Sequence, residues 1–253
     1  PVPSALRRSV FHWAVGALAG LALAPAAFAQ APAYPSKPIT FVVGYPPGGS
    51  TDLMGRMVGT ELSNRLGQPV LIENIGGAGG AIGAQKVASA QPDGYTLLVG
   101  ASNELAINKL VTKKVKYDIK DFTAIGLVAS QPLVLVASPA SGVKNAADFI
   151  QLVSKNPGKY SYGSSGVGTS LHLAGEMLKS QGNLFMTHIP YRGVAPLTND
   201  LVGNNLEFGV FVLSSGLPHI KSGKVVALGT TAAKRAPATP DIPALAELPQ
   251  IKN

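Results

Sequence analysis

Short apolar runs alternate with longer helical patterns along this chain, and each change falls at a turn rich in glycine or proline. Ile39–Val43 is apolar and short, as a buried strand is. Residues 51–66 then repeat leucine and methionine at helical spacing, and Gly67 ends the helix. Two further strands are expected at 70–73 and 95–99, with a second helix between them. This β-α-β-α-β order predicts a parallel sheet with helices on its faces.

The same alternation resumes in the second half of the chain. Two apolar runs, 122–128 and 133–137, are interpreted as a crossover into a second lobe. Beyond them we expect strands near 160–162, 186–189, 208–213 and 225–230, with helices near 146–154, 170–179, 195–202 and 217–221. The last of these strands can carry the chain back. The predicted fold is α/β with two lobes, each a mainly parallel sheet flanked by helices, joined by a hinge of two crossover strands that lets the lobes close on a ligand.

The first 29 residues have the layout of a signal peptide. Arg7 and Arg8 precede an apolar stretch at 10–24, and a small-residue cleavage site follows. We therefore expect export, with cleavage near Ala29-Gln30. The alternative is an uncleaved membrane anchor, but the apolar stretch is shorter than the roughly 20 residues that span a bilayer.

Composition excludes several classes of protein. The chain has no cysteine, so it has neither disulfides nor a lipoprotein anchor. Its net charge is +8, but the one tight basic cluster, Lys113, Lys114 and Lys116, has no interleaved aromatic residues, so we interpret it as a solvated turn and expect no nucleic-acid partner. His172 and Glu176 lie one helical turn apart without a visible third ligand, so a surface pair is favoured over a metal site. No P-loop, nucleophile elbow or zinc-protease motif occurs, and we expect neither an enzyme nor a cofactor.

Two loops have the composition of anion-binding turns. The first runs from Tyr45 through Gly48, Gly49, Ser50 and Thr51 to Asp52, and the second contains Ser164, Ser165, Gly168 and Thr169. Each lies between an expected strand and an expected helix, where ligands bind in open α/β sheets. Glycine N–H groups, hydroxyls and the positive helix end, worth about 0.3–1 kcal/mol per contact, would converge there. Either loop alone is also compatible with an ordinary N-cap turn. Together, they predict a pair of helix ends that hold an acidic ligand from two sides.

Five residues are candidates whose roles are considered one by one. Asp52 either caps its own loop or meets a ligand ammonium group. Arg192 either makes a bidentate contact with a carboxylate or is an exposed side chain without a specific role. Tyr45 and Tyr191 either wall the site or pack in the hinge. Asn103 lies in a third strand-to-helix turn.

A series of short motifs runs in order along nearly all of the chain after residue 29. They are Tyr34-Pro35-Ser36-Lys37-Pro38-Ile39, Pro47-Gly48-Gly49-Ser50-Thr51-Asp52, Gly67-Gln68-Pro69-Val70, Pro92-Asp93-Gly94-Tyr95, Tyr162-Gly163-Ser164-Ser165-Gly166, His172-Leu173-Ala174-Gly175-Glu176 and Pro190-Tyr191-Arg192-Gly193. Together they resemble the solute-binding receptors of tripartite tricarboxylate transporters, the TctC-like Bordetella uptake gene (Bug) family.

The resemblance implies a two-lobed periplasmic binding protein, type II-like, of the kind called a Venus flytrap. It implies capture of a small carboxylate, whether a di- or tricarboxylate, an acidic amino acid or an aromatic acid, for membrane transporter subunits. The ligand carboxylates would be held by residues 48–52 and 164–169, partly through ordered water. A periplasmic sensor with the same fold and an enzyme acting on a carboxylate are the alternatives. We expect a monomer.

The signal-peptide layout and the alternation of strands and helices suggest domain limits. We assign residues 1–29 to the signal peptide, 30–130 plus 231–253 to lobe 1, and 131–230 to lobe 2. Family members continue beyond the position of Asn253 with a further strand-and-helix section, so we expect a C-terminally truncated chain whose lobe 1 is incomplete.

Overall fold

The computed structural model describes residues 33–251, and the chain divides after Ser36 into two units. The helices and strands discussed below lie in the second unit, which begins at Lys37. The expected signal peptide, residues 1–29, lies outside the described residues.

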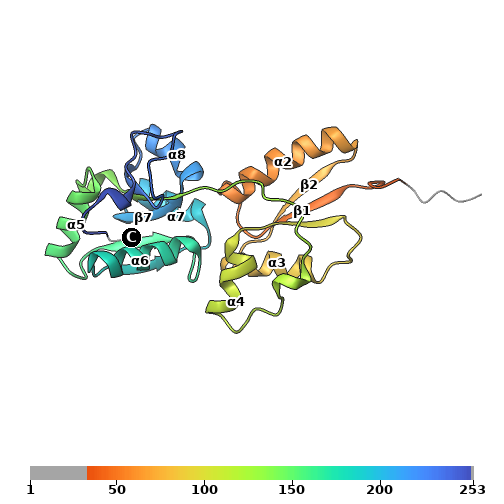
Figure 1. Ribbon diagram of the computed structural model, residues 1–253, viewed down its shortest axis with the longest axis horizontal. Helices are drawn as coiled ribbons and strands as arrows, with labels where there is room; N and C mark the ends of the chain where they lie inside the picture. Colours follow the sequence, from red (N-terminus) through yellow and green to blue (C-terminus); the bar gives the residue numbers. More distant parts are fainter. Residues whose placement is uncertain (1–32, 252–253) are drawn as a thin grey trace, which may run out of the picture. The chain divides into compact units, whose positions relative to one another are not determined.

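A three-stranded parallel sheet forms the first lobe. β1 (Ile39–Val43) is its central strand, and β2 (Val70–Asn74) and β3 (Thr96–Val99) pair with it on either side. The helices α2 (Ser50–Leu66) and α3 (Ala81–Ala88) connect successive strands (Figure 1). Parallel strands need such crossovers, so the predicted parallel sheet is confirmed here.

Small residues bring α2 close to this sheet. A Cβ on Gly55 would come within 3.3 Å of Val43, and one on Gly59 within 3.2 Å of Ile72. On the other side of the sheet, Ala81 and Ala84 of α3 are buried. The loops that leave β1 are therefore held close to both helices.

A five-stranded mixed sheet forms the second lobe, in the order β6-β5-β7-β4-β8. Its strands are β4 (Leu133–Ala137), β5 (Ser161–Ser164), β6 (Thr187–Pro190), β7 (Phe208–Val212) and β8 (Val226–Thr230). β5 is parallel to β6 and to β7, whereas β4 is antiparallel to β7 and to β8. Within this sheet β4 runs opposite to the other four strands, so the predicted mainly parallel arrangement is confirmed.

Helices cover both faces of the second sheet (Figure 1). They are α5 (Ala146–Lys155), α6 (Ser170–Gly182), α7 (Val194–Val202) and α8 (Leu213–Lys221). Successive β4 residues point to opposite faces, so Leu135 packs with α5 and α6 while Val134 packs with α7 and α8. The second lobe therefore has two buried cores.

Several short elements complete the described chain. A π-helix (Asn103–Ile107) runs into α4 (Asn108–Val111) in the first lobe. Single 3₁₀ turns occur at Ala78–Gly80, Ile119–Asp121, Pro139–Ser141 and Leu245–Glu247.

The connections between the lobes differ from the expectation. No strand forms at 122–128, because these residues have no neighbouring strand, and Ile125 and Leu127 are 80% and 87% exposed. β8 pairs with β4 and stays in the second sheet. Ile242, Leu245 and Ile251 then pack into the cores of that sheet. The described part of 231–253 therefore belongs with the second lobe and not with the first, which corrects that assignment. The remaining lobe limits stay predictions.

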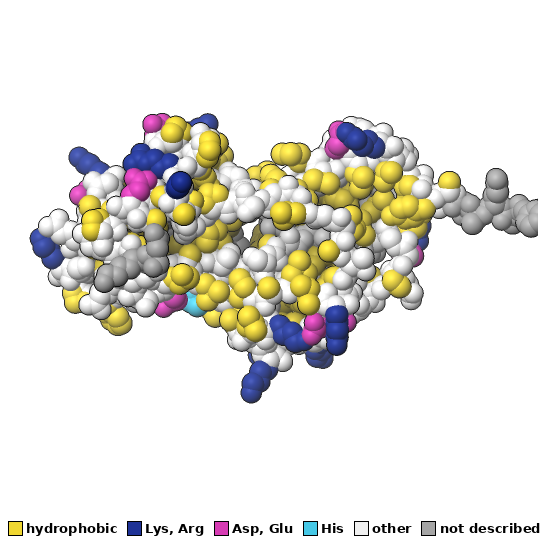
Figure 2. Space-filling model, viewed as in Figure 1, with side chains coloured by type: hydrophobic (Ala, Val, Ile, Leu, Met, Phe, Trp, Pro, Cys, Tyr) yellow, Lys and Arg dark blue, Asp and Glu magenta, His cyan; other side chains and the backbone are white. Residues whose placement is uncertain are grey.

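The surface carries charge in small separate groups. Figure 2 shows Lys and Arg side chains scattered over this face, several with Asp or Glu beside them. Ion pairs on the surface include Lys86–Glu73 and Arg235–Glu247. No helix among residues 33–251 is both long and apolar enough to cross a membrane.

Candidate functional site

The loop between β1 and α2 leaves the start of its helix open. Gly49 precedes α2 in an extended conformation, and no side chain caps the first turn. The N–H groups of a first helical turn have no partners within the helix. Within the part of the chain that the structure describes, no hydrogen bond occupies the hydroxyls of Ser50 and Thr51, which are half-buried. The turn therefore presents neutral donors at the positive end of α2.

Asp52 is engaged with its own lobe. Its carboxylate is 2% exposed and accepts hydrogen bonds from the Gly48 N–H at 2.9 Å, from Arg56 Nε at 3.0 Å and from Asn74 Nδ2 at 3.0 Å. Burial alone would raise the pKa of Asp52, but the bonds from Arg56, Gly48 and Asn74 hold it below its ordinary value. Asp52 therefore holds its own loop in place, as the capping interpretation predicts. The N–H of Gly48 is already occupied by its hydrogen bond to Asp52.

The hydroxyls of the second loop also hold the loop itself. Ser164 and Thr169 are fully buried. Both hydroxyls donate a hydrogen bond to the carbonyl oxygen of Gly166, Ser164 Oγ at 3.1 Å and Thr169 Oγ1 at 2.8 Å. Ser165 is 7% exposed, and within residues 33–251 its hydroxyl makes no hydrogen bond. Of the three hydroxyls of this second loop that were predicted to bind a ligand, the structure leaves that of Ser165 available.

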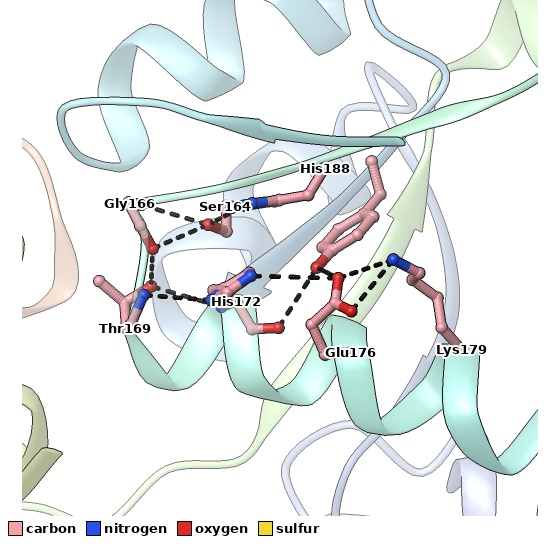
Figure 3. Close-up of polar contacts among 9 residues, drawn as sticks. Ser164, Gly166, Thr169, His172, Glu176, Lys179 and His188 are labelled. Carbon is pink, nitrogen blue, oxygen red and sulfur yellow. Dashed lines mark hydrogen bonds and ion pairs between the residues drawn. The ribbon is translucent and has the colours of Figure 1, made fainter. Parts of the chain in front are cut away.

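Two stacked histidines lie beside this loop and contact it (Figure 3). The rings of His172 and His188 lie 4.1 Å apart, centre to centre. His188 Nε2 lies 2.7 Å from Ser164 Oγ, and the Gly168 N–H donates to His172 Nδ1 at 3.1 Å. Burial lowers the pKa of both rings, that of His188 to about 4, so both are neutral near pH 7. Because His172 Nδ1 accepts a bond, its proton is on Nε2, which faces Glu176 at 4.0 Å.

Glu176 is the last member of this cluster, and the cluster does not form a metal site. It accepts hydrogen bonds from Tyr162 Oη at 2.6 Å and from Lys179 Nζ at 2.8 Å. Over the described range, no group of three or more His, Asp or Glu side chains could hold a metal ion.

Asn103 joins the two lobes at the start of α6. Its side-chain oxygen accepts the Ser170 N–H at 2.7 Å, and its Nδ2 donates to Tyr45 Oη at 2.7 Å. Asn103 is 4% exposed and begins the π-helix after β3. The structure thus brings Tyr45, from the first loop, and Asn103 to the second loop.

The turn after β6 reaches the first loop as well. A Cβ on Gly193 would come within 2.8 Å of Pro46, so only a glycine allows this approach. Tyr191 donates its hydroxyl to Asp200 at 2.6 Å, and burial together with Asp200 raises the pKa of Tyr191 to about 12. Arg192 is exposed, and no ion pair in the described chain involves it. Tyr191 is therefore a packing residue, whereas Arg192 is free to meet an anion.

The arrangement offers neutral donors and one exposed cation. Backbone N–H groups, hydroxyls and an arginine can bind an anion without transferring a proton to it. Asp52 is neutralised by Arg56, and His172 accepts a backbone hydrogen bond. Neither is placed as a general base for a substrate.

Comparison with known proteins identifies the family. The family model described as tripartite tricarboxylate transporter family receptor matches residues 54–253. BugT from Bordetella pertussis is 34% identical over 237 residues, which cover 92% of this chain and 73% of BugT. The chain belongs to the tripartite tricarboxylate transporter receptor family.

Two solved structures of similar proteins share the fold. Rpa4515 from R. palustris, solved with adipate, matches with a TM-score of 0.84 at 32% identity, over 87% of this chain and 74% of that one. MatC from Rhodopseudomonas palustris, solved with bound malate, matches with a TM-score of 0.80 at 30% identity, over 87% and 76%. These matches confirm the predicted α/β fold of a two-lobed periplasmic binding protein.

Several residues of this receptor's site were missed in the sequence. Glu104, next to Asn103, is 1% exposed and touches Tyr45. His188 and Asp200 hold Ser164 and Tyr191. A carboxylate inside the mostly apolar run after Asn103 was a weak signal for Glu104. The other two act across strands or helices, and no spacing pattern reveals such contacts.

Proposed function

We propose that this receptor captures a small organic carboxylate between its lobes and delivers it to a membrane transporter. The observation that carries the proposal is the open first turn of α2, where the Ser50 and Thr51 hydroxyls have no partner among the described residues. Such a helix start attracts anions. Adipate and malate, which accompany the two relatives above, are both dicarboxylates.

The proposed site divides its residues by role. Gly49, Ser50, Thr51, Ser165 and Arg192 would contact the ligand. The remaining candidates position these groups: Tyr45, Gly48, Asp52, Asn103, Ser164, Gly168, Thr169 and Tyr191.

The cellular setting is part of the same proposal. The signal-peptide pattern of residues 1–29 supports export to the periplasm with cleavage near Ala29-Gln30. We propose a monomer that needs no cofactor, binds no nucleic acid and performs no catalysis. The neutral donors of the site support binding without turnover.

A thermal-shift screen tests the proposal. The chain is melted with di- and tricarboxylates, acidic amino acids and aromatic acids. A ligand at a hundred times its Kd stabilises the folded state by about 2.7 kcal/mol, which raises the melting temperature measurably. Replacing Ser50 and Thr51 together by alanine should reduce the shift, whereas Ser180→Ala on the exposed side of α6 should not.

The outcomes separate the alternatives. A cooperative melt with no shift for any acid contradicts carboxylate capture. Turnover of a bound acid, followed by chromatography, would favour an enzyme. If a strain that lacks the gene still grows on the bound acid, the protein is a sensor rather than a transport receptor.

A further inference from the structure

Glu104 is a buried carboxyl group without a cationic partner. It is 1% exposed, and within the described chain no Lys, Arg or His forms an ion pair with it. Its Oε1 has no hydrogen-bond partner there. A Cβ on Gly80 would come within 2.7 Å of that oxygen, so the glycine leaves room for the carboxyl. Such a group is costly to bury in ionised form, and groups of this kind cluster at functional sites.

Among residues 33–251, the titratable groups that face Glu104 are two tyrosines. Tyr45 comes from the β1–α2 loop and donates to Glu104 Oε2 at 3.0 Å. Tyr117 donates to the backbone oxygen of Glu104 at 2.8 Å. Burial raises the pKa of Glu104 to about 7, although hydrogen bonds from its own backbone, from Tyr45 and from Ala101 act in the opposite direction. Its protonation therefore changes near neutral pH, while the tyrosines stay neutral.

A directional hydrogen-bond chain joins Glu104 to the second lobe. The Ser170 N–H can only donate, so Asn103 must present its oxygen to it and its Nδ2 to Tyr45 Oη. Tyr45 then has one proton to donate, and two acceptors lie within reach, Glu104 Oε2 at 3.0 Å and the Gly79 carbonyl at 3.2 Å.

Each protonation state of Glu104 satisfies this chain in a different way. When Glu104 is ionised, it accepts the Tyr45 proton. When Glu104 is protonated, it can donate to Tyr45 Oη, and Tyr45 donates to Gly79 instead. An anion bound between the lobes near Asn103 would repel the ionised form and favour the protonated form, because charges interact strongly in a buried site.

We propose that Glu104 makes ligand capture proton-linked: when a carboxylate binds between the lobes, Glu104 takes up one proton from solvent. Glu104 is a positioning residue that acts on the site through Tyr45 and Asn103. The proposal rests on carboxylate capture as the proposed function. It predicts tighter binding at lower pH, with the dependence set by a residue that the ligand does not touch.

The first experiment needs no ligand. Melting temperatures of the full chain, of Glu104→Gln and of the surface control Glu61→Gln are measured from about pH 5 to about pH 8. A carboxyl whose pKa is raised by folding destabilises the protein as pH rises from its unfolded value toward its folded value. As pH rises over this range, the melting temperature of the wild-type chain should therefore fall by roughly 5–10 °C relative to that of Glu104→Gln. The melting temperature of Glu61→Gln should follow that of the wild-type chain. Parallel curves for all three proteins would overturn the proposal.

The second experiment uses malate and adipate as probes. Calorimetric titrations above about pH 6.5, where both acids are fully ionised, are repeated in buffers of different ionisation enthalpy. The wild-type chain and Glu61→Gln should take up as much as one proton per probe bound. Their Kd should rise by up to about tenfold per pH unit. Glu104→Gln should bind with neither effect.

The two proposals fail in different ways. Probe binding to the wild-type chain without proton uptake overturns the role of Glu104 and leaves carboxylate capture intact. If neither these probes nor the wider acid panel binds, carboxylate capture fails and the proton-linked proposal fails with it. The wild-type titration needs no variant, so the test stands even if Glu104→Gln does not fold.

Discussion

At the scale of single residues, polar side chains that resemble ligand contacts mostly hold the loops in place. Asp52, Ser164 and Thr169 are buried and bond neighbouring backbone or side chains. Buried polar groups need partners, and here the partners are the loops themselves. The backbone N–H groups that a ligand would meet are thus placed by these side chains.

Asp52→Asn tests this role. It should lower the free energy of unfolding by about 1.5–3 kcal/mol at neutral pH, since bonds to a charged group are lost. The pKa of Asp52 is depressed, so its contribution is present above the unfolded pKa of about 4 and is lost as pH falls through the lower folded value. Urea unfolding at neutral and acidic pH measures the difference. Asp93→Asn, in the exposed pair with Lys37, should have a smaller effect, and an equal effect would contradict the role.

At the scale of elements, α6 is held to the second sheet by a tight contact next to the proposed site. A Cβ on Gly175 would come within 2.1 Å of the Tyr162 ring. Tyr162 lies on β5, donates to Glu176 and stands beside His188. The position of α6, and so of its N-terminus, depends on this contact.

Gly175→Ala should displace the Tyr162 ring and destabilise the protein by about 1–3 kcal/mol through overpacking. It should also weaken binding of any ligand found in the acid panel, because the start of α6 moves. Ser180→Ala, on the exposed side of the same helix, should stay within about 0.5 kcal/mol. Thermal unfolding with and without ligand measures both effects. An unchanged stability of Gly175→Ala would show that the ring moves freely.

At the scale of the whole molecule, the two lobes have separate cores. The second sheet buries large side chains on both faces, whereas the cluster beside α3 consists of Ala81, Ala84 and Tyr117. The lobes are therefore expected to open as separate units.

Leu201→Ala, at a fully buried position of α7, should cost about 2–5 kcal/mol. Hydrogen exchange followed by mass spectrometry should show faster exchange in β4, β5 and β7 and also in residues 242–251, which pack on that sheet. Exchange in β1, β2 and β3 should not change. Uniformly faster exchange would show that the lobes unfold together and that the proposed lobe limits have no energetic meaning.

The sequence alone determined the local elements and the class of fold. Periodicity located β1, α2, β5 and α6, because strand and helix patterns depend on neighbouring residues. Glycine and hydroxyl residues marked both loops for the same reason. Periodicity failed at 122–128, where an apolar run has no sheet to join.

Only the tertiary structure decided which polar groups remain available to a ligand and which are already hydrogen-bonded within the protein. The bonds of Ser164 to His188, of Tyr191 to Asp200 and of Tyr45 to Glu104 each join segments that are apart in sequence. It also decided that residues 242–251 pack on the second sheet. Such contacts depend on how elements pack in three dimensions, so local patterns cannot reveal them, and the environment of a buried carboxyl such as Glu104 exists only once the chain has folded around it.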